Sequence, residues 1–185
     1  MKILILYATT EGQTRKIAEF VADQLKGDDV ALADAANLRG AHPDPETFDA
    51  AILAASIHAG HYQSSLVHFA RENHARLNDM PALFLSVSLS AAGSDPDDLK
   101  GIAECAEKFK AATGWSKAEV LQIAGAFRFT KYDFFKSWVM RLIARQKKVK
   151  VNPNEDLEFT DWKALAGHIE AFRSRLGSRK MKKAG

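Results

Sequence analysis

The sequence predicts a doubly wound α/β fold, in which five parallel strands in the order 2-1-3-4-5 carry helices on both faces. Three observations predict it. Strand-like and helix-like segments alternate along the whole chain, which favours a parallel sheet with right-handed crossovers. Several strand segments are almost wholly apolar, as strands covered on both faces are. Five strands fit this order better than the six-stranded order of dinucleotide-binding sheets.

The first part of the chain predicts three strands and one helix. Residues 2–7 are almost wholly apolar and predict a buried strand. After a polar turn, apolar side chains recur at helical spacing at Ile17, Phe20, Val21 and Leu25. Gly27 is expected to end that helix in a left-handed conformation. Residues 30–33 and 50–56 are the second and third strands, and a proline-containing surface loop separates them.

The remaining elements repeat the alternation. Ser64 or Ser65 is expected to cap the next helix. The apolar residues of that helix are Leu66, Phe69, Ala70 and Leu77. A fourth strand follows over 82–87, and residues 95–114 predict a helix that starts at an Asp-Pro pair and ends at a glycine. Residues 119–124 are the last strand. The closing helix has its apolar stripe at Trp162, Leu165, Ile169, Phe172 and Leu176.

The composition excludes several classes of protein. Of the 185 residues, 46% are hydrophobic and 26% are charged, a balance typical of a globular domain and not of a disordered chain. The one cysteine, Cys105, excludes a disulfide framework and a cysteine-based zinc site, and it is expected to be a small buried residue. No metal site is predicted. The N-terminal apolar run is too short for a signal peptide and no segment is long enough to span a membrane, so the sequence predicts a cytosolic protein.

Positive charge is concentrated in residues 127–150. This segment holds eight basic side chains against one acidic one, a net charge of +7, whereas the rest of the chain sums to −4. It also holds 6 of the 17 aromatic residues. On a helical wheel Phe134, Phe135 and Trp138 lie opposite Arg141 and other cations, a pattern typical of a helix in a membrane interface. An amphipathic helix packed on its own domain has the same periodicity, and no motif indicates a nucleic-acid partner.

The turn after the first strand, residues 9–14, is suited to bind a phosphate. It joins a buried strand to a helix N-terminus, where free N–H groups and the helix dipole favour an anion. Gly12 allows the backbone to approach closely, and the threonine hydroxyls and the Gln13 amide can donate hydrogen bonds. The turn lacks the lysine of a triphosphate-binding loop and the glycines of a dinucleotide loop. The alternative is that its hydroxyls only cap the helix.

Three loops are expected to meet at one edge of the sheet. In a doubly wound sheet, ligands bind at the carboxyl ends of the strands, near the point where the strand order reverses. The loops at this edge are residues 9–14, 56–62 and 86–94, named here the first, second and third loops. The sequence therefore predicts a single binding site built from these three segments.

Residues in these loops resemble a known family. Thr9-Thr10-Glu11-Gly12-Gln13-Thr14 resembles the FMN-phosphate loop of flavodoxins, whose general form is (S/T)-(S/T)-x-G-(N/Q)-T. Further on, Gly60-His61-Tyr62 and the basic aromatic segment resemble one branch, the flavodoxin-type protoporphyrinogen IX dehydrogenases, which use a quinone. The resemblance spans the chain from residue 2 to about 175. It implies a flavodoxin-like fold with FMN as the cofactor.

The resemblance also implies which residues bind FMN. The phosphate would be held by Thr9, Thr10, Glu11, Gly12, Gln13 and Thr14. One side of the isoalloxazine ring would face Ser56, Ile57, His58, Ala59 and Gly60, and the other side would face Ser86, Val87, Ser88 and Leu89. Many flavodoxins place aromatic residues on both sides of the ring. Here residues 86–89 include none, and the second loop offers only His58 and Tyr62, which can equally be a solvated histidine and a packed tyrosine. No catalytic residue is identified.

The resemblance implies an enzyme of haem biosynthesis that dehydrogenates protoporphyrinogen IX to protoporphyrin IX and passes the electrons to a membrane quinone, menaquinone or ubiquinone. Substrate or an anionic membrane surface would contact Arg128, Lys131, Phe134, Phe135, Trp138 and Arg141. The expected location is peripheral, on the cytoplasmic side of the inner membrane. The alternatives are an NAD(P)H-quinone oxidoreductase, a flavodoxin-type electron carrier and a flavin-free binding module. The expected organisation is one domain over 1–176 with an insert at about 127–150, followed by a disordered basic tail over 177–185.

Overall fold

The computed structural model describes residues 1–37, 43–127 and 157–184. Within these ranges the centre of the molecule is a parallel sheet of five strands in the order β2-β1-β3-β4-β5. The strands are β1 (Lys2–Ala8), β2 (Asp29–Asp34), β3 (Ala50–Ser56), β4 (Ala82–Ser88) and β5 (Glu119–Ala124). The predicted fold class and strand order are therefore confirmed.

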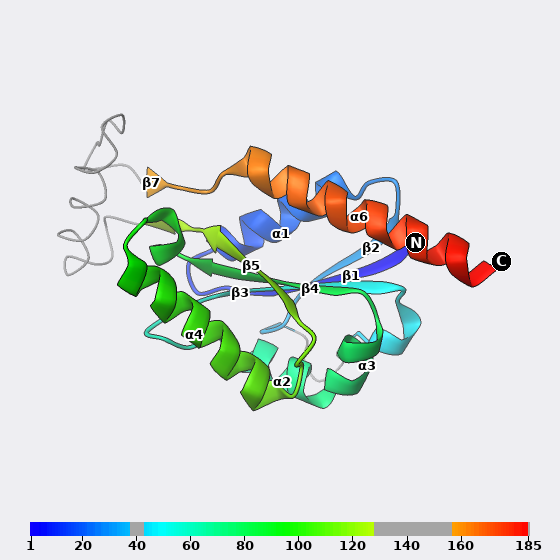
Figure 1. Ribbon diagram of the computed structural model, residues 1–185, viewed down its shortest axis with the longest axis horizontal. Coiled ribbons are helices and arrows are strands. Elements are labelled where there is room, and N and C mark those ends of the chain that lie inside the picture. The colour runs from blue at the N-terminus through cyan, green and yellow to red at the C-terminus, as the bar shows by residue number, and fades with distance from the viewer. Residues whose placement is uncertain (38–42, 128–156, 185) are drawn as a thin grey trace.

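Helices cover both faces of this sheet (Figure 1). One face carries α1 (Gln13–Gln24) and α6 (Trp162–Ala184). The other face carries α2 (Ser64–Glu72), α3 (His74–Asp79) and α4 (Pro96–Thr113). Two short 3₁₀ turns, η1 (Pro45–Thr47) and η2 (Ser90–Ala92), lie between these elements. The molecule is thus a three-layer sandwich of helices, sheet and helices.

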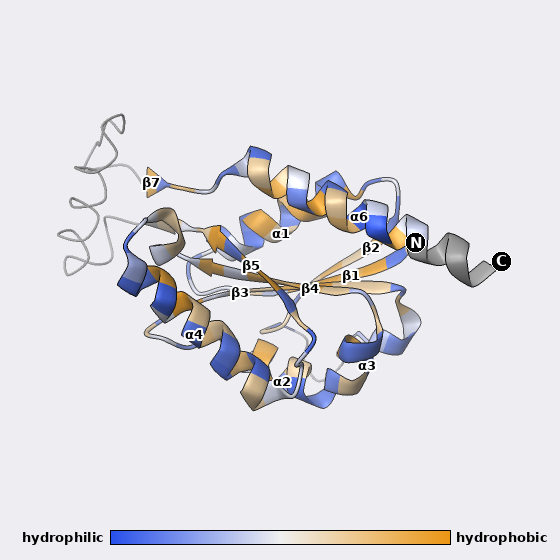
Figure 2. Cartoon of the chain, viewed as in Figure 1, coloured by the Kyte–Doolittle hydropathy of each residue, from blue (hydrophilic) through white to orange (hydrophobic). Residues whose placement is uncertain are grey.

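Alternation along the strands divides the core into two halves. In β1, Ile3 and Ile5 pack with α1 and α6, whereas Leu4 and Leu6 pack with the helices of the other face. All four side chains are fully buried, and each contributes roughly 1.5–3 kcal/mol by leaving water. Figure 2 shows the same division, with hydrophobic colour on the sheet and on the helix sides that face it. The apolar runs of the sequence are therefore strands buried on both faces, as predicted.

The first helix ends earlier than the sequence predicts. It ends at Gln24 with Leu25 as its C-cap, and Gly27 is not among the residues with a positive φ. The left-handed cap predicted at Gly27 is therefore wrong. A Cβ atom at Gly27 would lie 2.5 Å from the flexible end of the Arg173 side chain, which donates to Asp28 at 2.8 Å. A larger residue here would therefore displace the Arg173 side chain and disturb its ion pair with Asp28, without backbone strain.

The second helix also begins and ends differently. Gln63 occupies its N-cap, and no side chain caps it, so the predicted cap at Ser64 or Ser65 is wrong. The helix stops at Glu72 because Asn73 leaves the helical path and its side-chain amide donates back to the Phe69 carbonyl at 2.8 Å. The separate helix α3 then carries the predicted core residue Leu77.

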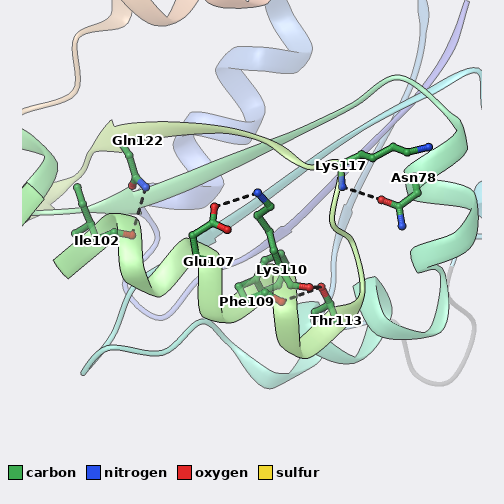
Figure 3. Close-up of polar contacts among 8 residues, drawn as sticks. All are labelled: Asn78, Ile102, Glu107, Phe109, Lys110, Thr113, Lys117 and Gln122. Atoms are coloured by element: carbon green, nitrogen blue, oxygen red, sulfur yellow. Dashed lines mark hydrogen bonds and ion pairs between the residues drawn. The ribbon is translucent and has the colours of Figure 1, made fainter. Parts of the chain in front are cut away.

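Helix α4 is bonded to β5, and helix α3 is bonded to the turn that precedes β5 (Figure 3). The N-cap Asp95 of α4 and its left-handed Gly114, with φ 77°, are the start and the end that the sequence predicts. The Gln122 amide on β5 donates to the Ile102 carbonyl at 3.4 Å. The Lys117 N–H, in the turn before β5, donates to the side chain of Asn78 on α3 at 2.9 Å. The bond from Gln122 ties Ile102, which lines the cavity described below, to β5.

Two short strands, one before and one after the basic segment in the sequence, form an antiparallel sheet that the sequence did not predict. It pairs β6 (Ala126–Phe127) with β7 (Leu157–Glu158). Apart from Phe127, the predicted insert over 127–150 lies outside the described residues. The same holds for Arg128, Lys131, Phe134, Phe135, Trp138 and Arg141. Within the described ranges, no helix combines the length and apolar character that crossing a bilayer requires.

The closing helix is longer than predicted. The predicted apolar stripe is confirmed, with Leu165, Ile169, Phe172 and Leu176 all buried against the sheet. The helix continues to Ala184, so the prediction of a disordered tail over 177–185 is wrong for residues 177–184. The basic composition of this stretch suggested a solvated coil, but lysine and arginine are also good helix formers.

Candidate cofactor site

A cavity of about 380 Å³ lies at the carboxyl ends of the strands, within the usual range for small-molecule and cofactor clefts. The register aligns Ala8 with Ala55, and Ser88 with Ala124, so the loops after these strands meet at one edge. The cavity is lined by Thr9, Thr10, Glu11, Gln13, Thr14, Ser56, Ile57, His58, Ala59, Gly60, Val87, Ser88, Leu89, Ser90, Ile102, Gly125 and Ala126. The three predicted loops therefore form one site.

The first loop reaches the N-terminus of α1 through a left-handed glycine. Gly12 is the N-cap of α1 with φ 94°, and no side chain caps the helix. The Gly12 N–H instead donates to the Thr9 hydroxyl oxygen at 2.9 Å. The first N–H groups of α1 have no partner within the helix. The alternative in which the loop hydroxyls cap α1 is therefore wrong, and Gly12 shapes the loop although it is not among the cavity-lining residues.

Thr14 carries a buried hydroxyl without a hydrogen-bond partner. The residue is fully buried and lines the cavity, and its Oγ1 has no partner among the described residues. An unsatisfied buried hydroxyl costs about 1–3 kcal/mol. A phosphate oxygen placed at the start of α1 would accept from this hydroxyl and from the free N–H groups of the helix. The residues present thus fit a phosphate monoester at this end of the cavity.

Gln63 connects the first and second loops. Its amide nitrogen donates to the Thr10 hydroxyl at 3.0 Å and to the Ser56 hydroxyl at 2.7 Å. Both acceptors line the cavity. The sequence analysis did not identify Gln63, because nothing in the local pattern distinguishes it from a solvated glutamine at a helix start.

The second loop contains a tight turn that satisfies its own backbone. His58 and His61 exchange two backbone hydrogen bonds, of 2.8 and 3.0 Å. The two central residues, Ala59 and Gly60, have φ values of 48° and 81°, the signature of a type I′ turn. Among the described residues, Ala59 is the one non-glycine residue with a positive φ. Such backbone strain often occurs at functional sites. The Cys105 thiol donates to the Gly60 carbonyl at 3.4 Å, so this half-buried cysteine contacts the site and is not the buried core residue that was predicted.

Tyr62 and Ser86 are not among the residues that line the cavity. Their hydroxyls are 2.8 Å apart, and the Tyr62 ring packs edge-on against Phe84 and Phe109. Burial raises the pKa of Tyr62 to about 12. Of the two interpretations of Tyr62, the structure supports the packed tyrosine. It also shows that Ser86, expected beside the flavin ring, is fully buried.

Comparison with known proteins identifies the family of this chain. A family model described as a flavodoxin domain matches residues 4–154. A protein of Escherichia coli named protoporphyrinogen IX dehydrogenase (quinone) is 34% identical over 167 residues, which is 90% of this chain and 91% of that protein. The chain belongs to the flavodoxin-type protoporphyrinogen IX dehydrogenase family. A protein of Leishmania major with the same name is 27% identical over 172 residues, 92% of this chain and 74% of that protein.

The likeness extends to solved structures of the fold. A Streptococcus pneumonia flavodoxin superposes with a TM-score of 0.52 at 15% identity, over 97% of this chain and 99% of that one. Family membership confirms the resemblance inferred from the sequence and the flavodoxin-like fold. A flavodoxin domain implies flavin binding, which confirms FMN as the expected cofactor.

The ring end of the cavity in this protoporphyrinogen IX dehydrogenase family member is bounded by small and aliphatic residues. No aromatic side chain lines the described part of the cavity apart from the His58 imidazole. Ser90 of the predicted third loop also lines the cavity, and the structure adds three wall residues outside the predicted loops: Ile102, Gly125 and Ala126. Within the described residues, no group of three His, Cys, Asp or Glu side chains could hold a metal ion.

Proposed function

We propose that this protein is an FMN-dependent dehydrogenase that converts protoporphyrinogen IX to protoporphyrin IX and passes the electrons to a membrane quinone, menaquinone or ubiquinone, in haem biosynthesis. The observation that carries the proposal is the likeness to the Escherichia coli protein named for this reaction, over about nine tenths of both chains. The cavity at the strand ends supports it with a phosphate site of suitable chemistry.

The first loop holds the cofactor by its phosphate. The Thr14 hydroxyl and the free N–H groups at the start of α1 donate to the phosphate oxygens, while Glu11 and Gly12 contribute through their backbone. When bound, FMN supplies the two-electron redox chemistry of the reaction. The remaining polar groups of this loop, on Thr9, Thr10 and Gln13, keep the loop in shape and line the same end of the cavity.

The second and third loops form the walls around the flavin ring. Ser56, Ile57, His58, Ala59 and Gly60 line the cavity and would face one side of the ring, and Val87, Ser88 and Leu89, which also line it, would face the other. The two walls are joined by the Ile57 N–H, which donates to the Val87 carbonyl at 2.8 Å. Because these walls are mostly small and aliphatic, the ring edge stays open to a large flat substrate such as a porphyrinogen.

The basic segment is the proposed contact for substrate and membrane. Its charge of +7 suits the two propionates of a porphyrinogen and the anionic headgroups of a lipid surface. The described ends of the segment support this proposal, because Ala126 lines the cavity and pairs with Glu158. The location that follows is peripheral, on the cytoplasmic side of the inner membrane. We assign one domain to residues 1–176, with the insert at about 127–150 and the basic end of the chain over 177–185.

Anaerobic turnover tests the proposed reaction. Purified protein loaded with FMN is mixed with protoporphyrinogen IX and a menaquinone or ubiquinone analogue, and porphyrin fluorescence is followed. We expect fluorescence to rise only when both the quinone and the protein are present. Quinone reduction by NADH or NADPH without any porphyrinogen oxidation would instead assign a NAD(P)H-quinone oxidoreductase. Absence of turnover with every donor would indicate an electron carrier.

Arg128→Ala with Lys131→Ala tests the role of the basic segment. We expect the KM for protoporphyrinogen IX to rise about tenfold, because each lost charge-assisted hydrogen bond weakens binding of a propionate. The control is Lys100→Ala with Lys108→Ala, which removes the same charge from exposed positions on α4. Equal KM values for the two double variants would contradict the assignment. Sedimentation of the wild-type chain with anionic but not with neutral vesicles is expected from the same charge.

A further inference from the structure

We propose that Thr160 is a positioning residue for the FMN phosphate, acting through Gln13 at the start of α1. The inference rests on the proposed function and deepens it, because it adds a residue from a distant part of the chain to the cofactor site. Thr160 lies just after β7 and is 147 positions away from Gln13. No pattern within the first loop points to it.

The Thr160 hydroxyl forms a relay between two elements that meet at the cavity. It accepts a hydrogen bond from the Gln13 amide nitrogen at 2.9 Å and donates one to the Ala124 carbonyl at 2.7 Å. The residue is buried, with 9% of its surface exposed. A single hydroxyl group can accept from an amide and donate to a carbonyl at once. Valine has the same shape but would leave both partners without their hydrogen bond.

The hydrogen bonds of Thr160 fix Gln13, the residue that directly precedes Thr14. Gln13 is the first residue of α1 and directly precedes Thr14, whose hydroxyl has no partner among the described residues. The Gln13 amide was expected to donate to the phosphate, but in the structure it is directed to Thr160. Holding the Gln13 side chain restricts the first turn of α1, and with it the direction of the N–H groups that face the phosphate.

Further contacts join the segment around Thr160 to the same helix and to the cavity wall. On α1, the Lys16 ammonium pairs with Glu158 and lies 5.3 Å from the centre of the Trp162 ring. The Phe159 N–H donates to the carbonyl of Gly125, a wall residue, at 3.0 Å. Since the segment contacts both the start of α1 and the wall, the inference is that phosphate binding orders this segment, and any such coupling is reciprocal.

Affinities for FMN and for riboflavin, which lacks the phosphate, test the role of Thr160. We expect Thr160→Val to weaken FMN binding about tenfold and riboflavin binding less than about twofold, while Thr160→Ser keeps both affinities. The matched control is Thr113→Val. Thr113 is another buried threonine, whose hydroxyl donates to the Phe109 carbonyl at 2.9 Å away from the cavity (Figure 3). Thr113→Val should leave the ratio of the FMN and riboflavin affinities unchanged.

Hydrogen exchange of the wild-type protein tests the coupling without any variant. We expect FMN to slow exchange of the amides in residues 157–162, including that of Phe159, and riboflavin at equal occupancy to slow it much less. Equal weakening of FMN and riboflavin by Thr160→Val would reduce Thr160 to a general structural role and overturn the inference. Unchanged FMN affinity in the variant, or equal protection by both ligands, would overturn it as well. If the wild-type chain bound no FMN at all, the proposed function itself would fail, which is a distinct result.

Discussion

The first and second loops border the same cavity but satisfy their polar groups in opposite ways. The first loop enters α1 through a glycine with φ 94°, and among the described residues the Thr14 hydroxyl has no hydrogen-bond partner and no side chain caps the helix. The second loop closes on itself through two backbone hydrogen bonds between His58 and His61. From this difference we propose a division of roles. The first loop would bind the phosphate, and the second would form a preorganised wall beside the flavin ring.

The conformations of the central residues support this division. Gly12 adopts its positive φ without strain, whereas Ala59 adopts φ 48° with a Cβ atom present. The second loop can hold a strained residue because its surroundings fix it, through the two bonds of the turn and the contact of Cys105 with Gly60. Substitutions in the two loops should therefore separate FMN affinity from stability.

The largest effect is expected from Gly12→Ala. A Cβ atom at φ 94° costs about 1–2 kcal/mol and moves the loop away from the geometry that the phosphate needs. We expect urea denaturation to show that loss, and FMN titration to show affinity lowered more than about tenfold. Gly101→Ala is the matched control, because Gly101 lies in α4 with open space around it, and it should raise stability by roughly 0.5–1 kcal/mol. Similar changes in stability and FMN affinity in the two variants would contradict the role assigned to Gly12 in the first loop.

Tyr62→Phe should affect stability but not FMN affinity. The variant leaves the buried Ser86 hydroxyl without a partner and should lower the free energy of unfolding by about 1 kcal/mol. Changing Ser86 to alanine in the same background should restore part of that loss, because both partners are then absent. A large loss of FMN affinity in the single variant would contradict the packing role of Tyr62.

The same tyrosine predicts a dependence of stability on pH. Burial raises the pKa of Tyr62 from 10.0 in the unfolded chain to about 12 in the folded one. The unfolded state therefore loses its proton first as pH rises, so the stabilisation is complete below pH 10 and is lost progressively up to about pH 12. The Tm of Tyr62→Phe, measured by thermal unfolding, should fall less steeply over that pH interval than the Tm of the wild type.

The sheet and the three loops at its edge could be predicted from the sequence, because they depend on patterns of neighbouring residues. The apolar runs at β1, β3 and β4 predicted the sheet, and the topology of the sheet then placed three polar loops at one edge. The links from Gln63 to Thr10 and from Thr160 to Gln13 could not be predicted, because these partners lie 53 and 147 residues apart. The pair β6 and β7 has two residues in each strand, which is too short for a periodic signal.

The smallest effect is expected from Ala59→Asn. Asparagine tolerates a positive φ better than alanine and is favoured before glycine in a type I′ turn, so stability should rise by a few tenths of a kcal/mol. Ala103→Asn, on the exposed side of α4, should instead lower stability by about 0.5 kcal/mol. FMN affinity should stay within about twofold of the wild type in Ala103→Asn, and should fall much less in Ala59→Asn than in Gly12→Ala, because the phosphate site is unchanged. A loss of FMN affinity in Ala59→Asn as large as that of Gly12→Ala would contradict the division of roles between the two loops.

The most direct test of the phosphate site is Thr14→Val, measured with and without FMN. The valine removes a buried hydroxyl that has no partner in the described structure, so the apoprotein should be as stable as the wild type or more stable by about 1 kcal/mol. FMN affinity should fall by about tenfold or more, with riboflavin affinity nearly unchanged. A destabilised apoprotein that binds FMN as tightly as the wild type would contradict the assignment of this hydroxyl to the phosphate.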